Sequence, residues 1–195
     1  MHTRTYWKLN AEQEKALSGW IRYSTVYDLG AGDMNLSRYM ALFARHVHAI
    51  DKDLAEPYKL PKNVTCYPTT FQKFKAPKTI DCAVISWPPN YNCLELIELV
   101  KMASRVVYIG KNTDGTACGT PALFLHLTRR RLAVEVRSEH NCLHCYGAVE
   151  SEEPQFRSEE EVCGLITRGP FRILHDGGLL ADPLALARSV AEIPA

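Results

Sequence analysis

Short apolar runs alternate with longer stretches of mixed polarity between Thr25 and Val149. This alternation is typical of strands that are joined by helices, and it predicts a mostly parallel sheet with helices packed on its faces. The runs predict strands at residues 24–29, 46–50, 64–67, 80–86, 105–109, 132–137 and 143–149. The intervening pattern predicts helices at residues 11–23, 36–45, 93–103 and 121–131.

Two details refine the expected fold class. The run at residues 80–86 is almost wholly apolar, as expected of a strand that is buried on both faces, and Pro88 and Pro89 end it. The last two strands can pair antiparallel through a turn near residues 140–141. We therefore expect a Rossmann-like three-layer α/β sandwich whose parallel sheet is closed by an antiparallel hairpin.

The chain shows no internal repeat and no long polar linker, so residues 1–195 are expected to form one domain. An N-terminal helix would lie within residues 1–23 and the core within residues 24–150. Residues 151–195 would form an extension with a short helix at residues 159–167 and either a terminal helix or a partly ordered tail at residues 181–195.

Composition excludes several classes of protein. Apolar residues make up 46% and the formal net charge is +1, so neither disorder nor a strongly basic surface is expected. The tight basic run Arg129–Arg131 is interpreted as a solvated helix end. No apolar run approaches the roughly 20 residues of a membrane span, and the seven cysteines suit free thiols in the cytoplasm. The oligomeric state is left open.

The strongest chemical signal is the segment from Val26 to Asp33, Val-Tyr-Asp-Leu-Gly-Ala-Gly-Asp, placed where a strand ends and a helix begins. Gly30 and Gly32 allow a tight turn and a close approach of backbone to a bound nucleoside. Asp51 ends the next strand, at a spacing where an acidic side chain binds ribose hydroxyls. The alternative is that the segment is an ordinary turn between a strand and a helix and binds no ligand.

A nicotinamide cofactor fits this segment less well. Its fingerprint needs a third glycine at position 35, where the chain has Asn35, and Asp33 would repel a pyrophosphate. A cofactor with a sulfonium and an ammonium group suits the carboxylates better.

The segment from Asp28 to Asp33, followed by Ala49-Ile50-Asp51, resembles motifs I and II of the Rossmann-like (class I) S-adenosylmethionine-dependent methyltransferases. The resemblance implies S-adenosylmethionine as the cofactor. It further implies that Asp28, Gly30 and Gly32 hold the methionine moiety, and that Asp51 holds the ribose. The adenine-binding position after the third strand falls at residues 69–71, with the hydroxyl of Thr70 as a partner. The chain departs from the family at Met34, where a third glycine is common.

A second motif, Ser86-Trp87-Pro88-Pro89-Asn90-Tyr91, follows the fourth strand. It resembles the Asp/Asn/Ser-Pro-Pro-aromatic motif of methyltransferases that act on exocyclic amines of nucleobases, although Trp87 stands at the polar position and Asn90 at the aromatic one. The resemblance suggests Ser86, Asn90 and Tyr91 as catalytic residues, with Ser86 also near the cofactor. The expected substrate-binding residues are Trp87, Pro88, Pro89, Asn90, Tyr91, Lys111 and Asn112.

Core packing is the alternative for Trp87 and Tyr91, and capping of the next helix is the alternative for Lys111 and Asn112. Tyr108 is expected in the core. The cluster His140, Cys142, His144 and Cys145 lies within six residues and lacks the second spaced pair of a zinc site, so no metal is expected.

Together these patterns favour a methyltransferase that acts on a small-molecule or amine-type acceptor. The chain has little sequence for a target-recognition domain, so sequence-specific DNA methylation by this chain alone is not expected. A non-catalytic protein that binds S-adenosylmethionine or a nucleoside, or that serves as a partner subunit, is the alternative. A nicotinamide-dependent oxidoreductase ranks third.

Overall fold

The computed structural model describes residues 9–54, 59–88, 94–110, 118–139 and 141–150. These residues form four helices and seven strands in the order α1 (Ala11–Ile21), β1 (Thr25–Leu29), α2 (Asn35–Met40), β2 (His46–Asp51), β3 (Val64–Pro68), β4 (Ile80–Ser86), α3 (Leu94–Lys101), β5 (Ala103–Gly110), α4 (Pro121–Thr128), β6 (Arg130–Arg137) and β7 (Cys142–Val149).

All seven strands form one sheet in the order β3-β2-β1-β4-β5-β7-β6. The first five strands are parallel, while β7 runs antiparallel to both β5 and β6. The order reverses between β1 and β4, so the carboxyl ends of these two strands flank the crevice where open α/β sheets bind ligands. The expected fold class is thus confirmed.

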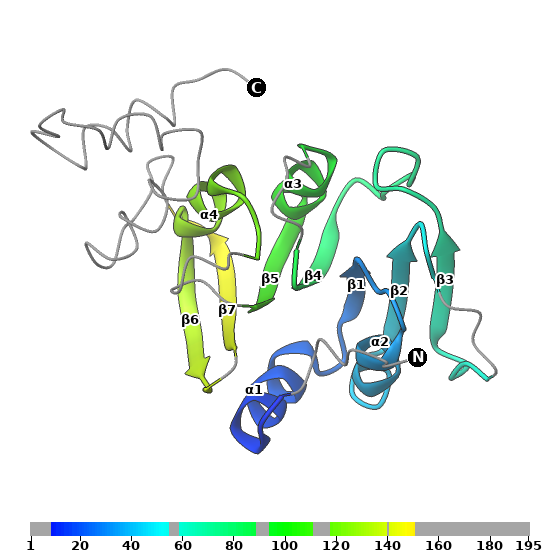
Figure 1. Ribbon diagram of the computed structural model, residues 1–195, viewed down its shortest axis with the longest axis horizontal. Coiled ribbons are helices and arrows are strands. Elements are labelled where there is room, and N and C mark those ends of the chain that lie inside the picture. The colour runs from blue at the N-terminus through cyan, green and yellow to red at the C-terminus, as the bar shows by residue number, and fades with distance from the viewer. Residues whose placement is uncertain (1–8, 55–58, 89–93, 111–117, 140, 151–195) are drawn as a thin grey trace, which may run out of the picture.

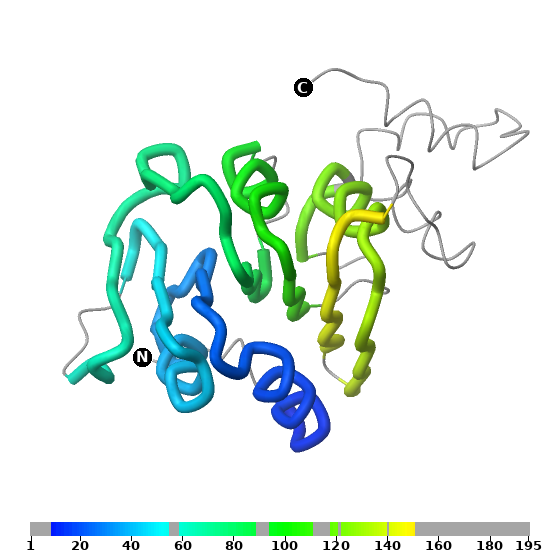
Figure 2. Tube along the Cα trace, turned by 180° about the vertical axis from the view of Figure 1, so that it is seen from behind, coloured from blue at the N-terminus to red at the C-terminus, as the bar shows by residue number. Residues whose placement is uncertain are grey.

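Helices cover both faces of the sheet. In Figure 1, α1 and α2 lie on one face, whereas α3 and α4 lie on the other, and the reverse view in Figure 2 shows the same layering. Alternate side chains of each strand enter opposite cores: Val26 packs with Leu17 and Met40 under the first pair of helices, while Tyr27 packs in the core under the second pair.

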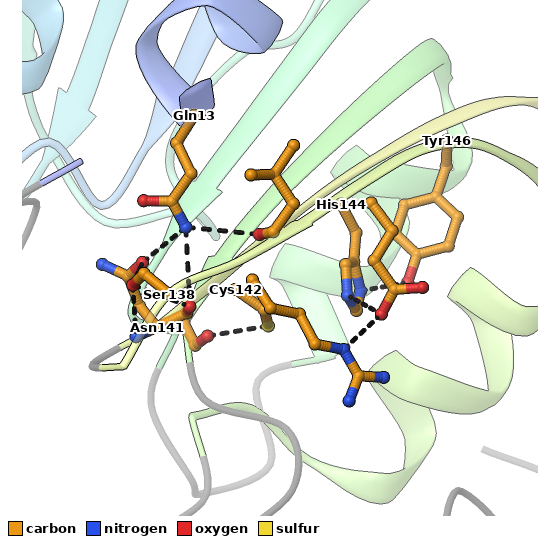
Figure 3. Close-up of polar contacts among 10 residues, drawn as sticks. Gln13, Ser138, Asn141, Cys142, His144 and Tyr146 are labelled. Atoms are coloured by element: carbon orange, nitrogen blue, oxygen red, sulfur yellow. Dashed lines mark hydrogen bonds and ion pairs between the residues drawn. The ribbon is translucent and has the colours of Figure 1, made fainter. Parts of the chain in front are cut away.

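Local sequence explains where α1 begins. The Asn10 side chain accepts a hydrogen bond from the backbone N–H of Gln13 at 2.8 Å, and the Gln13 side chain accepts one from the backbone N–H of Asn10 at 3.1 Å. This reciprocal cap satisfies two donors that the first helical turn leaves open. The amide nitrogen of Gln13 also donates to Asn141 Oδ1 at 2.7 Å, which ties the helix to the β6–β7 hairpin (Figure 3).

One expectation is wrong. Arg129–Arg131 do not form a solvated helix end, because α4 stops at Thr128 and β6 begins at Arg130. Arg130 is buried, and its guanidinium donates to the backbone carbonyls of Val100, Ala103 and Gly147 at 2.8, 2.8 and 3.1 Å. The side chain therefore joins the end of α3 to the hairpin, a long-range role that a local charge pattern does not reveal.

The connection between β3 and β4 is short. Residues 69–79 cross the face of the sheet without forming a helix, and Phe74 packs its ring against Tyr27 and Tyr67. Strands β2 and β3 are consequently covered on this face by a loop instead of a helix.

Cys66, Cys82, Cys118, Cys142 and Cys145 are free thiols. No helix within the described ranges is long and apolar enough to cross a membrane.

Candidate cofactor-binding site

A cavity of about 530 Å³ opens at the carboxyl ends of β1, β2, β3 and β4 and at the start of α3. Its lining residues come in five groups, one from each of these elements: Leu29 and Gly30; Asp51, Lys52 and Asp53; Thr69, Thr70, Phe71 and Gln72; Ser86, Trp87 and Pro88; Glu95 and Leu96. The cavity thus lies at the switch point of the sheet, where its topology predicts a ligand.

The glycine bend after β1 forms one wall. The backbone N–H groups of Gly30 and Ala31 both donate to the carbonyl of Ile50, at 2.9 and 3.2 Å, so the bend is held against β2. Gly30 has φ 90° and Gly32 has φ 49°, values that favour glycine, and a Cβ built on either would meet no atom within 4 Å. The bend therefore leaves open space beside the backbone.

Asp51 closes the neighbouring wall. Its Oδ2 accepts a hydrogen bond from the backbone N–H of Gly32 at 3.0 Å, and its Oδ1 accepts one from the backbone N–H of Asp53 at 2.8 Å. A carboxylate offers about four lone-pair sites, and these two hydrogen bonds use only part of them. The half-buried carboxylate can therefore accept further hydrogen bonds from hydroxyl groups of a ligand in the cavity.

Asp28 is not among the residues that line the cavity. Its side chain is buried, and Oδ2 accepts a hydrogen bond from the hydroxyl of Ser37. The pKa of the Asp28 carboxyl is raised to about 7, mainly because the group is buried; the hydrogen bond from Ser37 lowers it, and the nearby carboxylates of Asp51 and Asp33 raise it. Oδ1 has no hydrogen-bond partner among the described residues. A ligand ammonium near this carboxyl would thus favour its ionised form.

The end of β4 forms the third wall. Trp87 has φ 50°, a left-handed conformation that is strained for a tryptophan, and its backbone N–H donates to Ile109 O at 2.8 Å. The indole Nε1 is buried without a hydrogen-bond partner in the described part of the chain. The half-buried ring both packs on the core and lines the cavity, so packing and ligand contact are compatible roles.

Several of the sequence-predicted site residues come together here. Gly30, Asp51, Thr70, Ser86, Trp87 and Pro88 all line the cavity. Pro89, Asn90, Tyr91, Lys111 and Asn112 lie outside the described residues, so their roles remain predictions. Tyr108 is fully buried, as expected, and its hydroxyl donates to Cys118 O at 2.9 Å.

Sequence reasoning missed other lining residues. Lys52 and Asp53 directly follow Asp51, and Gln72 follows the predicted adenine position, so proximity to those motifs was an available signal. Glu95 and Leu96 come from α3 and enter the site because β4 lies beside β1. Only the strand order could have indicated them.

The Cys and His cluster of the hairpin has other partners (Figure 3). Cys142 Sγ contacts Gly110 O at 2.9 Å, and the ring of His144 lies between the Tyr146 hydroxyl and a carboxylate oxygen of Glu135, at 3.1 and 3.2 Å. Cys145 packs in the core on the α1 side, whereas Cys142 packs in the core on the α3 side. Within the described ranges, no three His, Cys, Asp or Glu side chains converge on one point.

Comparison with known proteins gives a likeness in structure alone. No family model matches this chain, and no curated protein matches it by sequence. The N-methyltransferase NodS from Bradyrhizobium japonicum WM9 aligns over 71% of this chain and 96% of its own, with 14% identity and a TM-score of 0.51. In complex with S-adenosyl-L-homocysteine, NodS aligns over 87% of its chain and 71% of this one, with 14% identity and a TM-score of 0.52.

A second protein of known structure is similar to the same extent. The 1,6-didemethyltoxoflavin-N1-methyltransferase from Burkholderia thailandensis, with bound 1,6-didemethyltoxoflavin and S-adenosylhomocysteine, aligns over 71% of this chain and 79% of its own, with 14% identity and a TM-score of 0.52. At this identity the likeness establishes the fold, which is the Rossmann-like fold of class I methyltransferases.

Proposed function

We propose that this protein transfers a methyl group from S-adenosylmethionine to a small-molecule or amine-type acceptor. The observation that carries the proposal is the wall shared by Asp51 and the glycine bend, which borders a cavity large enough for a nucleoside cofactor. The fold supports it too, because two structurally similar methyltransferases are described in complex with S-adenosylhomocysteine.

The residues of the cavity fit the chemical groups of this cofactor. Asp51 would accept hydrogen bonds from the ribose hydroxyls, and the open space beside Gly30 and Gly32 would admit the amino-acid part close to the backbone. The hydroxyl of Thr70 would bond to the adenine amine, while the ring of Phe71 and the side chain of Leu96 offer apolar contact. The carboxyl of Asp28, near Asp51 and with one oxygen free of partners among the described residues, suits an ammonium group nearby.

The cofactor, when bound, supplies an electrophilic methyl carbon on a sulfonium sulfur. The chain's own residues need only bind, orient and exclude water, since orientation alone can provide a large part of the rate. Trp87 and Pro88 form a stiff wall at the end of β4, and the carbonyl of Pro88 accepts a hydrogen bond from Gly119 N–H at 2.9 Å. Ser86 would orient the acceptor amine beside this wall, together with Asn90 and Tyr91 as the motif suggests.

A non-catalytic binding protein is the second candidate. One observation favours it: the polar position of the amine-binding motif holds Trp87, whose only polar side-chain atom is buried. Such a protein would bind the cofactor without using it.

Thermal unfolding with S-adenosylmethionine, S-adenosylhomocysteine and NAD tests the cofactor. A ligand at 100 times its Kd stabilises the native state by about 2.7 kcal/mol, so the two adenosyl compounds should raise Tm and NAD should not. Transfer of a radiolabelled methyl group to a panel of small amines then tests turnover. Stabilisation without methyl transfer would favour the non-catalytic binding protein. No stabilisation by either adenosyl compound would contradict both the methyltransferase and the binding protein.

A further inference from the structure

The region between the second and fourth strands is strongly basic although the whole chain is nearly neutral. Residues 57–80 contain five lysines and no aspartate or glutamate, while the net charge of the chain is +1. We define the basic band as Lys62, Lys73, Lys75 and Lys78 together with Arg45, and all five side chains belong to exposed residues.

Three members of the basic band lie along one edge of the sheet. Parallel strands begin at the same end of the sheet. Arg45 directly precedes β2, while Lys62 and Lys78 each stand two residues before the start of β3 and β4. Val47 N–H donates to Asn63 O at 2.8 Å, and the Asn63 side chain donates to Ala44 O at 3.2 Å. These bonds bring Lys62 next to Arg45, since neighbouring strands lie only about 4.8 Å apart.

Lys73 and Lys75 extend the band over the face of the sheet. They flank Phe74, whose ring packs inward on Tyr67 with centroids 5.1 Å apart, so the two lysines stand on the outer side of the loop. None of Lys62, Lys73, Lys75 and Lys78 pairs with a carboxylate of the described residues. Asp81, at the start of β4, is bound by Arg105 at 2.7 Å. The charges of the four lysines are therefore unpaired within the described residues, whereas Arg45 lies near enough to Asp81 to help lower the pKa of that carboxyl.

Ring side chains lie beside this loop. His46, His48 and Tyr67 are half-buried at β2 and β3, where the loop of residues 69–79 covers the sheet in place of a helix. His46 Nε2 lies 2.8 Å from Thr65 Oγ1, and His48 Nδ1 lies 3.1 Å from the Tyr67 hydroxyl. Each histidine keeps a second ring nitrogen that can bond to a ligand. The face thus combines cations with polar ring edges.

We propose that the basic band and these rings bind a single-stranded polynucleotide. The cations would contact successive phosphates, and the polar ring edges of His46 and His48 would hydrogen-bond to bases that are not paired. The band begins at the rim of the cofactor cavity, because Thr70, Phe71 and Gln72 line the cavity and Lys73 follows directly. Of the exposed large apolar residues in the described chain, Leu94 and Val149 lie on α3 and β7, whereas Tyr23 and Leu42 lie near Arg45, so the test includes vesicles of anionic lipid.

The test measures fluorescence anisotropy of labelled 20-nucleotide RNA and DNA strands with the full chain, without cofactor, at several salt concentrations. The variant Lys73→Glu/Lys75→Glu should weaken binding by roughly tenfold or more, and the slope of log K against log salt should become about 1.4 smaller in magnitude. The control variant Lys15→Glu/Arg131→Glu changes the net charge equally at exposed residues of α1 and β6, and it should bind nearly as the native chain does.

Equal losses in the two variants, or no binding by the native chain at low salt, would overturn the proposal. Heparin or vesicles of anionic lipid that bind as tightly, with the same sensitivity to Lys73→Glu/Lys75→Glu, would also overturn it. A comparison of the affinities for the RNA and DNA strands shows which of the two nucleic acids the band binds more tightly. Thermal unfolding of both variants with S-adenosylhomocysteine separates this test from the proposed function, because neither variant changes a residue of the cavity.

Discussion

The carboxylate of Asp51 accepts a hydrogen bond from the backbone N–H of Gly32, 3.0 Å away, and so joins the end of β2 to the bend after β1. The two residues are 19 positions apart in the chain, but the parallel pairing of β1 with β2 brings them together. The bond gives Asp51 two tasks, because one carboxylate both holds the glycine bend and lines the cavity.

Replacement of Asp51 by alanine should weaken binding of S-adenosylhomocysteine by about 10- to 100-fold, since hydrogen bonds to a charged acceptor contribute about 1.5–3 kcal/mol. Isothermal titration calorimetry measures the change. Asp53→Asn is the matched control, because Asp53 lines the same cavity but is more exposed and pairs with Lys52. An Asp51→Ala affinity equal to that of the control would mean that the ribose binds elsewhere.

Gly30→Ala should destabilise the protein by about 1–2 kcal/mol, because an alanine at φ 90° is strained even though its Cβ meets no atom. The added methyl group would also enter the cavity wall and lower the affinity for S-adenosylhomocysteine. Gly19→Ala is the control, as Gly19 lies in α1 with open space around it and should gain about 0.5–1 kcal/mol. Denaturant unfolding of both variants checks the opposite signs.

Asp28→Asn should make the free protein more stable at pH 8 than the native chain, by an amount on the order of 2–4 kcal/mol. Burial raises the pKa of Asp28 from 3.8 to about 7. Between about pH 4 and pH 7 the unfolded chain has released this proton while the native state retains it, so stability falls as the pH rises through this window. Asparagine does not titrate, and it can still accept the bond from Ser37.

Thermal unfolding at pH 5 and pH 8 measures this difference, with Asp53→Asn as an exposed control whose charge is not among those that shift the pKa of Asp28. The advantage of Asp28→Asn should be larger at pH 8. An advantage that is the same at both values would show that Asp28 is ionised throughout.

Arg130→Met should destabilise the native state by about 2–4 kcal/mol. The substitution removes donors from three backbone carbonyls that the arginine side chain satisfies in the interior, and it leaves them without partners. Arg131→Met is the matched control, since Arg131 is exposed and its contact with Glu150 at 3.7 Å is weak. Urea unfolding of the two variants should differ clearly, and similar midpoints would contradict the structural role of Arg130.

The sheet and its helices were largely readable from the sequence. Apolar runs such as residues 80–86 marked buried strands because a strand covered on both faces has few polar positions. Most boundaries differ by three residues or fewer, as at α4, which is expected to reach residue 131 and ends at Thr128, whereas the helix expected at residues 36–45 ends at Met40. Gly30, Asp51 and Ser86 were placed at the site because their motifs follow strand ends, and strand ends meet at one edge.

Other features needed the tertiary structure. Arg130 belongs to a basic run that is typical of a solvated surface, yet its burial depends on carbonyls from α3 and β7 that are distant in the chain. The lysines of the basic band are separated by apolar and polar residues, so no tight run marks them, and only the pairing of β2 with β3 sets Lys62 beside Arg45.

By itself, the sequence determined the alternation of strands and helices, the glycine bend and the acid that follows it, because these depend on local periodicity and on the backbone freedom of glycine. The tertiary structure decided which residues enclose the cavity, which charges are buried and which remain on the surface. Those properties depend on the order of the strands, which brings distant segments side by side and sets how much water reaches each group.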